Sequence, residues 1–280
     1  MLHMLHISDL HFPSENLIFA ERELRNGLVE LIEDIDAENL FFLISGDITF
    51  KGRPEGYREA TRFFQDIINS TGNKIKPSNI LLCPGNHDIV REGGFEEFNV
   101  FAYSLRKDNR FSYGDKSYVI YETETEFFLG INSCYHLDHQ YGFVNIEELS
   151  RTLERIEFRK HTRKVAFTHH HLINQFQNDI SSIRNASKLI ILLDEYGFET
   201  VFHGHQHNNS NLVLGRSQMF AFGVQAPGFP MPGYTSGLNY YKINDDGLEL
   251  WKYIYSRDNV SQGNVGGFLK NGPVQYSRKS

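Results

Sequence analysis

Hydrophobic positions along the chain follow two different periods. Short apolar runs rich in β-branched residues read as strands. Between several of them, apolar residues recur at spacings of three and four, which predicts amphipathic helices. The expected strands span residues 4–7, 40–45, 79–83, 118–121, 127–131, 164–168 and 200–203, and the expected helices span residues 21–35, 57–68, 146–157 and 186–195.

The order of these elements predicts the fold class. Strands that alternate with helices indicate βαβ units, an α/β fold and a largely parallel sheet. After residue 210 the pattern changes to short apolar runs separated by Gly, Pro, Asn and Asp, which is typical of antiparallel hairpins. Ser, Gly, Asn and Lys dominate the last segment. We therefore expect a domain over residues 1–255 and an irregular C-terminal tail over residues 256–280.

Polar residues gather where five of the expected strands give way to loops. In open α/β sheets, ligands bind outside the carboxyl ends of the strands, so patches far apart in sequence can converge there. We expect such a convergence here. The five patches are Asp9-Leu10-His11, Gly46-Asp47, Gly85-Asn86-His87-Asp88, His169-His170-His171 and Gly204-His205-Gln206-His207.

The side chains in these patches suit divalent metal ions. Carboxylate, amide and imidazole donors without a thiolate favour ions such as Mn, Fe, Co or Zn. Asp9 and His11 lie two residues apart, as do His205 and His207. In extended backbone each pair can point both side chains to one side. Any one patch also fits an ordinary turn, a capping pair or a solvated run, so the combination carries the hypothesis.

Composition and charge narrow the class of protein. The chain has 280 residues, of which 40% are hydrophobic, so it can build a substantial core. Its formal net charge of -7 disfavours a protein that holds nucleic acid through a basic surface. Two cysteines, Cys83 and Cys134, need no disulfide framework. Without a signal peptide or a long apolar span, we expect a soluble, cytoplasmic protein.

The ordered set of patches resembles the calcineurin-like metallophosphoesterase superfamily over roughly residues 1–210. The superfamily signature is Asp-x-His, Gly-Asp, Gly-Asn-His-Asp or Glu, His, and Gly-His-x-His. The segments at residues 7–11 and 46–49 are also similar to a bacterial branch that includes cyclic nucleotide phosphodiesterases. The resemblance implies a four-layer α/β/β/α metallophosphoesterase sandwich, with two central sheets packed face to face and helices outside.

The resemblance also implies a site for two divalent metal ions, taken from Mn, Fe, Zn or Co. Asp47 would bridge the two ions. His87 would serve as the leaving-group acid or stabilise charge in the transition state, and Asp88 would orient its imidazole. The implied ligands are Asp9, His11, Asp47 and His207 for one ion, and Asp47, Asn86, His169 and His205 for the other.

The run of three histidines departs from the family pattern. The family usually shows His-His-Pro, whereas Leu172 follows the third histidine here. We prefer His169 as the ligand because it directly follows the expected strand at residues 164–168. His170 is the alternative ligand, and the neighbour that does not bind metal could contact phosphate.

The function that follows is hydrolysis of a phosphodiester or phosphomonoester by a hydroxide that bridges the two metals. Charge and length favour a small, nucleotide-like substrate, and the oligomeric state is left open. One alternative is a metal-dependent nuclease on DNA or RNA, and another is a catalytically silent metal-binding scaffold. A nuclease would need a basic track, for which the candidates are Arg91, Arg106, Lys107, Arg110 and Arg184.

Several other conspicuous side chains are expected to lie outside the site. His3 and His6 precede the end of the first strand and are expected to be structural. His136 and His139 lie on a loop that could reach the substrate, although this is the less favoured interpretation. An aromatic cluster is expected to pack in the core, and the less favoured interpretation is a lid or recognition helix. It consists of Phe95, Phe98, Phe101 and Tyr103.

Overall fold

The computed structural model describes residues 1–72, 74–90, 94–114, 116–159, 163–229, 233 and 235–277. Within these residues the strands form two mixed sheets of six strands each. The first sheet has the order β12-β11-β10-β1-β2-β3. Its strands are β1 (Leu2–Ile7), β2 (Leu40–Ile44), β3 (Ile80–Leu82), β10 (Gly237–Ile243), β11 (Gly247–Tyr255) and β12 (Phe268–Ser277).

In the first sheet β1, β2 and β3 run parallel, whereas β10 to β12 form an antiparallel meander. β1 sits between the two parts, where Leu5 pairs with Phe42 on one side and with Tyr240 on the other. β2 is buried at every position. That continuous burial fits a parallel strand whose two faces are both covered.

The second sheet has the order β4-β5-β6-β7-β9-β8. β5, β6, β7 and β9 are parallel neighbours, and β4 and β8 pair antiparallel at the two edges. The strands are β4 (Tyr118–Glu122), β5 (Glu126–Ile131), β6 (Arg163–Thr168), β7 (Thr200–His203), β8 (Asn211–Leu214) and β9 (Met219–Gly223).

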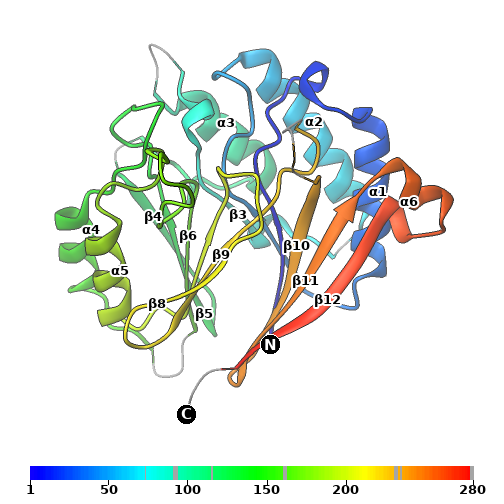
Figure 1. Ribbon diagram of the computed structural model, residues 1–280. Coiled ribbons are helices and arrows are strands. Elements are labelled where there is room, and N and C mark those ends of the chain that lie inside the picture. Colours follow the sequence, from blue (N-terminus) through cyan, green and yellow to red (C-terminus); the bar gives the residue numbers. More distant parts are fainter. Residues whose placement is uncertain are drawn as a thin grey trace.

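Helices cover the outer faces of both sheets (Figure 1). Beside the first sheet lie α1 (Glu21–Asp34), α2 (Pro54–Ser70), α3 (Glu96–Arg106) and the short α6 (Arg257–Ser261), and beside the second lie α4 (Ile146–Leu153) and α5 (Ala186–Glu195). The stripe predicted for α2 is buried, including Phe63 and Phe64. Among the described residues, no helix has both the length and the apolar character needed to cross a membrane.

Strand alternation divides the interior into two hydrophobic cores. Phe128 on β5 points into the larger core, which runs from helices α1 to α3 through the first sheet to the inner face of the second. Its neighbours Phe127 and Leu129 point the other way, into the smaller core beneath α4 and α5. Side chains that alternate in this way bury both faces of the second sheet. The predicted four-layer α/β/β/α sandwich is thus confirmed.

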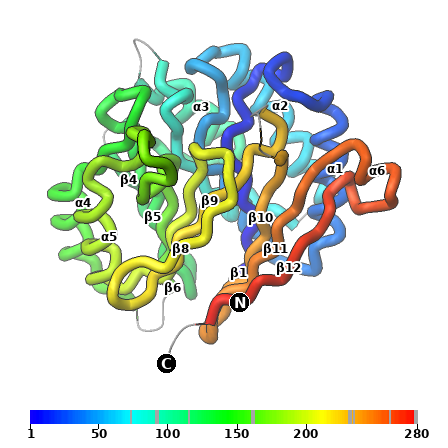
Figure 2. Tube along the Cα trace, in the orientation of Figure 1, coloured from blue at the N-terminus to red at the C-terminus, as the bar shows by residue number. Residues whose placement is uncertain are grey.

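The end of the chain differs from the expectation of an irregular tail over residues 256–280. Residues 257–261 form α6, and β12 pairs along β11 with Leu248 opposite Tyr276. Figure 2 shows these last two strands side by side. The pairing satisfies backbone groups that β11 would otherwise expose. Nearly all β12 side chains are exposed, so the strand carries no hydrophobic alternation that would reveal it in the sequence.

The aromatic cluster after the Asn86 patch belongs to α3 and the residue before it. Phe98 and Phe101 are buried against the core, and Phe95 is buried at the helix start, whereas Tyr103 is half exposed. The packing interpretation is confirmed for the three phenylalanines. The segment is a helix, as the less favoured interpretation of the cluster allowed, and its phenylalanines pack in the core as the favoured interpretation predicts.

Candidate metal centre

The five polar patches converge at the carboxyl ends of β1, β2, β3, β6 and β7. Neighbouring loops are joined by the backbone there, since the Asp9 N–H donates to Gly46 O at 3.0 Å and the His11 N–H donates to Asp47 O at 2.9 Å. The expected meeting of distant patches is therefore observed. The side chains brought together are those of Asp9, His11, Asp47, Asn86, His169, His205 and His207.

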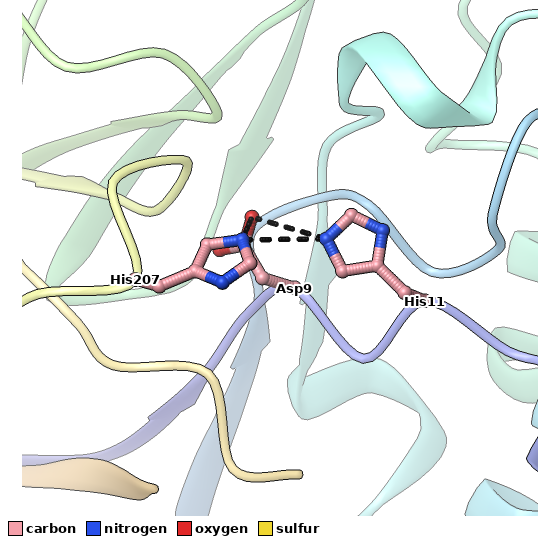
Figure 3. Close-up of side chains that lie close together, drawn as sticks. All are labelled: Asp9, His11 and His207. Carbon is pink, nitrogen blue, oxygen red and sulfur yellow. Dashed lines mark hydrogen bonds and ion pairs between the residues drawn. The ribbon is translucent and has the colours of Figure 1, made fainter. Parts of the chain in front are cut away.

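A first cluster of donor atoms consists of Asp9, His11 and His207, all buried (Figure 3). One ligand atom from each lies within 4.8 Å of the others. Asp9 Oδ1 is 3.2 Å from His207 Nε2, and the two imidazole Nε2 atoms are 3.3 Å apart. Possible ligand atoms from all three residues thus surround one small volume that could hold a cation.

A second cluster consists of Asp47, His169 and His205, whose ligand atoms also lie within 4.8 Å of one another. His169 Nε2 is its centre, at 3.1 Å from both Asn86 Oδ1 and His205 Nδ1. The same nitrogen is 3.3 Å from Asp47 Oδ2. The Asn86 amide oxygen therefore joins a carboxylate and two imidazoles as a possible fourth, uncharged donor.

Asp47 connects the two clusters through a single oxygen. Its Oδ2 lies 3.3 Å from His169 Nε2 in the second cluster and 3.7 Å from His11 Nε2 in the first. The other oxygen, Oδ1, accepts the backbone N–H of His87 at 2.8 Å. This bond holds the carboxylate in one orientation, so that Oδ2 faces both sets of donors.

The backbone at the site adopts the left-handed conformation, which non-glycine residues seldom occupy. Asp and His are among the residues that tolerate it best, and strain of this kind persists where surrounding structure enforces it. At a strand end, the reversal of φ turns the chain sharply and keeps consecutive ligand side chains on the inner side. The φ values are 59° for Asp9, 52° for His11, 52° for Asp47, 72° for His205 and 49° for His207.

Gly46 and Gly85 make room for this arrangement. Gly46 has a φ of 94°, and a Cβ there would lie 2.7 Å from both Gly85 N and His169 Nδ1. A Cβ on Gly85 would collide with Asp47 Oδ1. Both positions thus need a residue without a side chain, because the loops after β2 and β3 approach each other closely around the Asp47 carboxylate.

The electrostatics of the site favour a bound cation. Burial alone would raise the pKa of Asp9 and Asp47, but the neighbouring imidazoles of His207 and His169 hold both values well below the usual range. Burial opposes the charge on His169 as well, yet the Asp47 carboxylate raises the pKa of His169 to about 9. Two buried carboxylates therefore stay ionised and demand positive charge.

An unsatisfied atom tests whether a metal ion would fit. Asp9 Oδ1 is buried and makes no hydrogen bond of standard geometry, and its near neighbour is the His207 imidazole, with Nε2 at 3.2 Å. A buried acceptor that lacks a well-formed hydrogen bond is costly, and a coordinated cation removes that cost. The donor set of carboxylate, amide and imidazole atoms also matches ions of intermediate softness. The residues present therefore fit a divalent metal.

The three consecutive histidines occupy distinct places. His169 reaches Asp47, and its Nδ1 is 2.9 Å from Ser45 O, which fixes the ring. His170 is fully buried, with Nδ1 2.8 Å from Ser133 Oγ. His171 bonds Asp179 at 2.7 Å and stacks near His205. The structure thus places the preferred His169, and not the alternative His170, beside the shared carboxylate.

These positions predict different effects of two neighbouring substitutions. His169→Ala should weaken manganese binding by more than about 100-fold, because loss of an outer-shell partner alone costs about 10- to 100-fold. His170→Ala, an equally buried imidazole, should cause a smaller loss. Calorimetric titration of both variants with Mn²⁺ measures this. A larger loss in His170→Ala would reverse the assignment.

His87 lies beside the clusters, but Asp88 does not orient it as expected. The carboxylate of Asp88 accepts the N–H groups of Ile48 at 2.9 Å and Gly85 at 2.8 Å. It also accepts the Tyr57 hydroxyl at 3.2 Å. Asp88 thus ties together the loops after β2 and β3. The expectation that it orients the imidazole was wrong, because both of its carboxylate oxygens accept backbone N–H groups instead.

Several residues near the donors escaped the sequence analysis. The ring of His87 stacks on Phe50, with centroids 5.1 Å apart, and Phe229 lies 4.2 Å from the His11 ring. Phe50 lies three residues after Asp47, and this closeness to the Gly46-Asp47 patch is a signal that could have suggested it. Phe229 belongs to the Gly- and Pro-rich run at residues 227–234, whose place after the Gly-His-x-His patch predicts that it could border the pocket, although the sequence does not single out this ring.

The histidines that were expected to lie outside the site differ in how close they come to it. His3 bonds the Tyr240 hydroxyl, and His6 bonds Ser45 Oγ at 2.7 Å beneath the site, in keeping with structural roles. His139 touches the site through both its backbone and its side chain, because Asn86 Nδ2 donates to His139 O at 3.1 Å and His139 Nδ1 lies 3.1 Å from Asn86 O. The exposed His136 packs against Phe143 instead.

Arg106, one of the candidates for a basic track in a nuclease, is not available on the surface. Arg106 is buried, and its guanidinium donates to Asp108 and to the carbonyls of Ser78 and Ile80. Arg110 pairs with the same Asp108, and Arg184 lies over the Tyr141 ring. Arg91 lies outside the described residues.

Comparison with solved structures shows the same fold. A dimetal phosphatase from Danio rerio superposes with a TM-score of 0.64 at 12% identity, covering 89% of this chain and 95% of that one. The purple acid phosphatase PPD1 from yellow lupin gives a TM-score of 0.60 at 14% identity, covering 96% of this chain and 53% of that one.

Sequence comparison identifies the family. The "Uncharacterized metallophosphoesterase-like protein YydB" of Bacillus subtilis is 38% identical over 91 residues, which are 31% of this chain and 18% of that protein. The chain thus matches less than a fifth of that relative's length. The family model for calcineurin-like phosphoesterase matches residues 2–209, which is most of the chain. The chain therefore belongs to the calcineurin-like phosphoesterase family.

Proposed function

We propose that this chain hydrolyses phosphate esters with the help of two divalent cations held by the two donor clusters. The observation that carries the proposal is the position of Asp47 Oδ2, which faces His11 Nε2 at 3.7 Å and His169 Nε2 at 3.3 Å. One ion would be held by Asp9, His11, Asp47 and His207, and the other by Asp47, Asn86, His169 and His205. When bound, such a pair lowers the pKa of water and neutralises charge on phosphoryl oxygens.

The remaining site residues set up the reaction. Asn86 contributes an amide oxygen without adding negative charge, so the acidity of the cations is preserved. His87 is partly exposed, next to His11 and Asp47, and its ring can meet a bound substrate. We assign it the proton that the leaving group needs, or stabilisation of the negative charge that develops there.

Removal of the His87 side chain should slow the chemical step. His87→Ala keeps the backbone N–H that Asp47 accepts, so metal binding should persist. We expect kcat to fall on the order of 100-fold, the usual contribution of a general acid. Steady-state kinetics at saturating Mn²⁺ measure this, with exposed His136→Ala as the matched control. Unchanged kcat would remove His87 from the mechanism.

Hydrolysis of bis-p-nitrophenyl phosphate and p-nitrophenyl phosphate by the manganese-loaded protein tests the proposed function directly. Turnover of either supports an esterase and separates diesterase from monoesterase activity. Absence of turnover with the metal bound would favour a catalytically silent scaffold. Manganese is the first choice for loading, and Fe, Zn and Co are the other ions that the donors suit.

A small, nucleotide-like substrate is the proposed class. The net charge of -7 opposes a long polyanion, and burial of Arg106 weakens the case for a nucleic-acid track. A screen against cyclic nucleotides, nucleotide diphosphates, single-stranded DNA and phosphoproteins distinguishes this class from a nuclease. Cleavage of DNA alone would make the nuclease the better assignment. Residence in the cytoplasm is part of the same proposal.

A further inference from the structure

Two phenylalanine rings stand beside the donor clusters. Phe229 lies 4.2 Å from the His11 ring and 5.5 Å from the His207 ring, measured between centroids. Phe50 stacks on His87 at 5.1 Å with an interplanar angle of 19°. The two phenylalanine rings are 6.3 Å apart and nearly parallel, at 27°. They form a continuous aromatic wall on the His11 and His87 side of the site.

Accessibility indicates that this wall faces a ligand. The donors beneath it are buried, with 0% exposure for Asp9, 1% for Asp47 and 2% for His11. Phe50 and Phe229, in contrast, are both partly exposed, as is His87. The atoms that an incoming molecule meets at this side of the clusters therefore belong to rings.

The position of His87 indicates which part of the substrate the aromatic wall would meet, namely the ester group that leaves. If the phosphoryl group sits at the donors and His87 serves the leaving group, the ester group extends along Phe50 and Phe229. Lys51 Nζ and Arg53 Cζ lie 5.0 and 5.9 Å from the Phe50 centroid, so two cations adjoin this ring. A flat, polarisable group packs against such rings with favourable geometry.

We propose that Phe50 and Phe229 bind a planar aromatic ring in the ester group of the substrate. The inference rests on the proposed function and narrows its substrate class to phosphate esters of ring-bearing alcohols. A nucleobase and a simple aryl group share this chemistry. Recognition by stacking tolerates different bases, because every base presents a π-face.

Non-hydrolysable phosphonates isolate the contribution of the ring. Phenylphosphonate and methylphosphonate carry the same anionic group and differ in the ring, and calorimetry on the manganese-loaded protein gives their affinities. We expect phenylphosphonate to bind about 10-fold more tightly, the effect of one stacking contact. Phe50→Ala and Phe229→Ala should each reduce this ratio, with the affinity for methylphosphonate and the manganese content unchanged.

Three controls make the outcome decisive. Phe229→Leu keeps apolar volume without a π-face and should lose most of the preference, whereas Phe229→Tyr should retain it. Phe176→Ala removes a phenylalanine that is 54% exposed on the loop after His171 and should leave the ratio intact. A nucleoside 5′-phosphonate that binds more tightly than phenylphosphonate assigns the ring to a nucleobase, and weaker binding assigns it to an aryl group.

Equal binding of phenyl- and methylphosphonate to the wild-type protein, together with hydrolysis of p-nitrophenyl esters, would overturn the ring-binding role and leave the esterase intact. Loss of the preference in Phe176→Ala, but not in Phe50→Ala or Phe229→Ala, would also overturn it. Failure of the esterase proposal gives a different result, namely no turnover of any ester despite full manganese occupancy.

Discussion

Asp47→Ala is expected to lower metal-dependent hydrolysis on the order of 10³-fold or more, the largest loss of activity that the structure predicts. Its Oδ2 is the atom common to both donor clusters, so its removal should weaken both cation sites together. The lowered pKa of Asp47 means that the neighbouring imidazoles stabilise its charge, so the substitution also costs the apo protein some stability. Most of the fold should survive, because the hydrophobic core does not include Asp47. Kinetics and Mn²⁺ titration of the purified variant measure both effects.

Two further substitutions serve as controls. One separates the effect of the Asp47 charge from that of its shape, and the other compares the site with an exposed carboxylate. Asp47→Asn keeps an oxygen that can accept the His87 N–H, yet it lacks the negative charge, so it should be nearly as inactive as the alanine variant. Asp66→Ala removes an exposed carboxylate that pairs with Arg25 at 2.7 Å and should have little effect. Full activity in Asp47→Ala would refute the bridging assignment.

Arg106→Ala is expected to give the largest loss of stability, about 3 kcal/mol or more in the free energy of unfolding. The side chain has 0% exposure and donates to Asp108 at 3.2 and 3.1 Å. It also bonds the carbonyls of Ser78 and Ile80 next to β3 and lies 4.3 Å from the Phe111 ring. Alanine leaves these acceptors unsatisfied beside a cavity. Urea denaturation followed by circular dichroism measures the change.

The neighbouring Arg110 provides the control for that measurement. It contacts the same Asp108 at 3.7 Å, but its side chain is 60% exposed, so Arg110→Ala should change stability little. Arg106→Lys retains the charge without the planar fork and should fall between wild type and alanine. If Arg106→Ala unfolded like the wild type and instead weakened binding to DNA, the basic track and the nuclease would regain support.

Much of the fold could be predicted because the pattern of apolar and polar residues in a segment indicates which of its side chains are buried. The runs that became β2, β5 and β9 are apolar because both faces of these strands are buried, and α2 shows its buried stripe in its spacing. β12 could not be predicted in this way. Its side chains are mostly exposed, so only its backbone bonds to β11 define it.

For the site, the sequence by itself determined which residue types stand at the strand ends, and parallel strands then bring those ends together. Only the tertiary structure decided which atom each side chain meets. Asp88 bonds backbone groups of Ile48 and Thr49 about 40 positions earlier in the chain, and the Phe229 ring packs beside His11, which lies near the start of the chain. The periodicity of a segment shows which face of a helix or strand is buried. The partner of a side chain from another part of the chain depends on how the loops cross, and local residue spacing does not encode the crossing of loops.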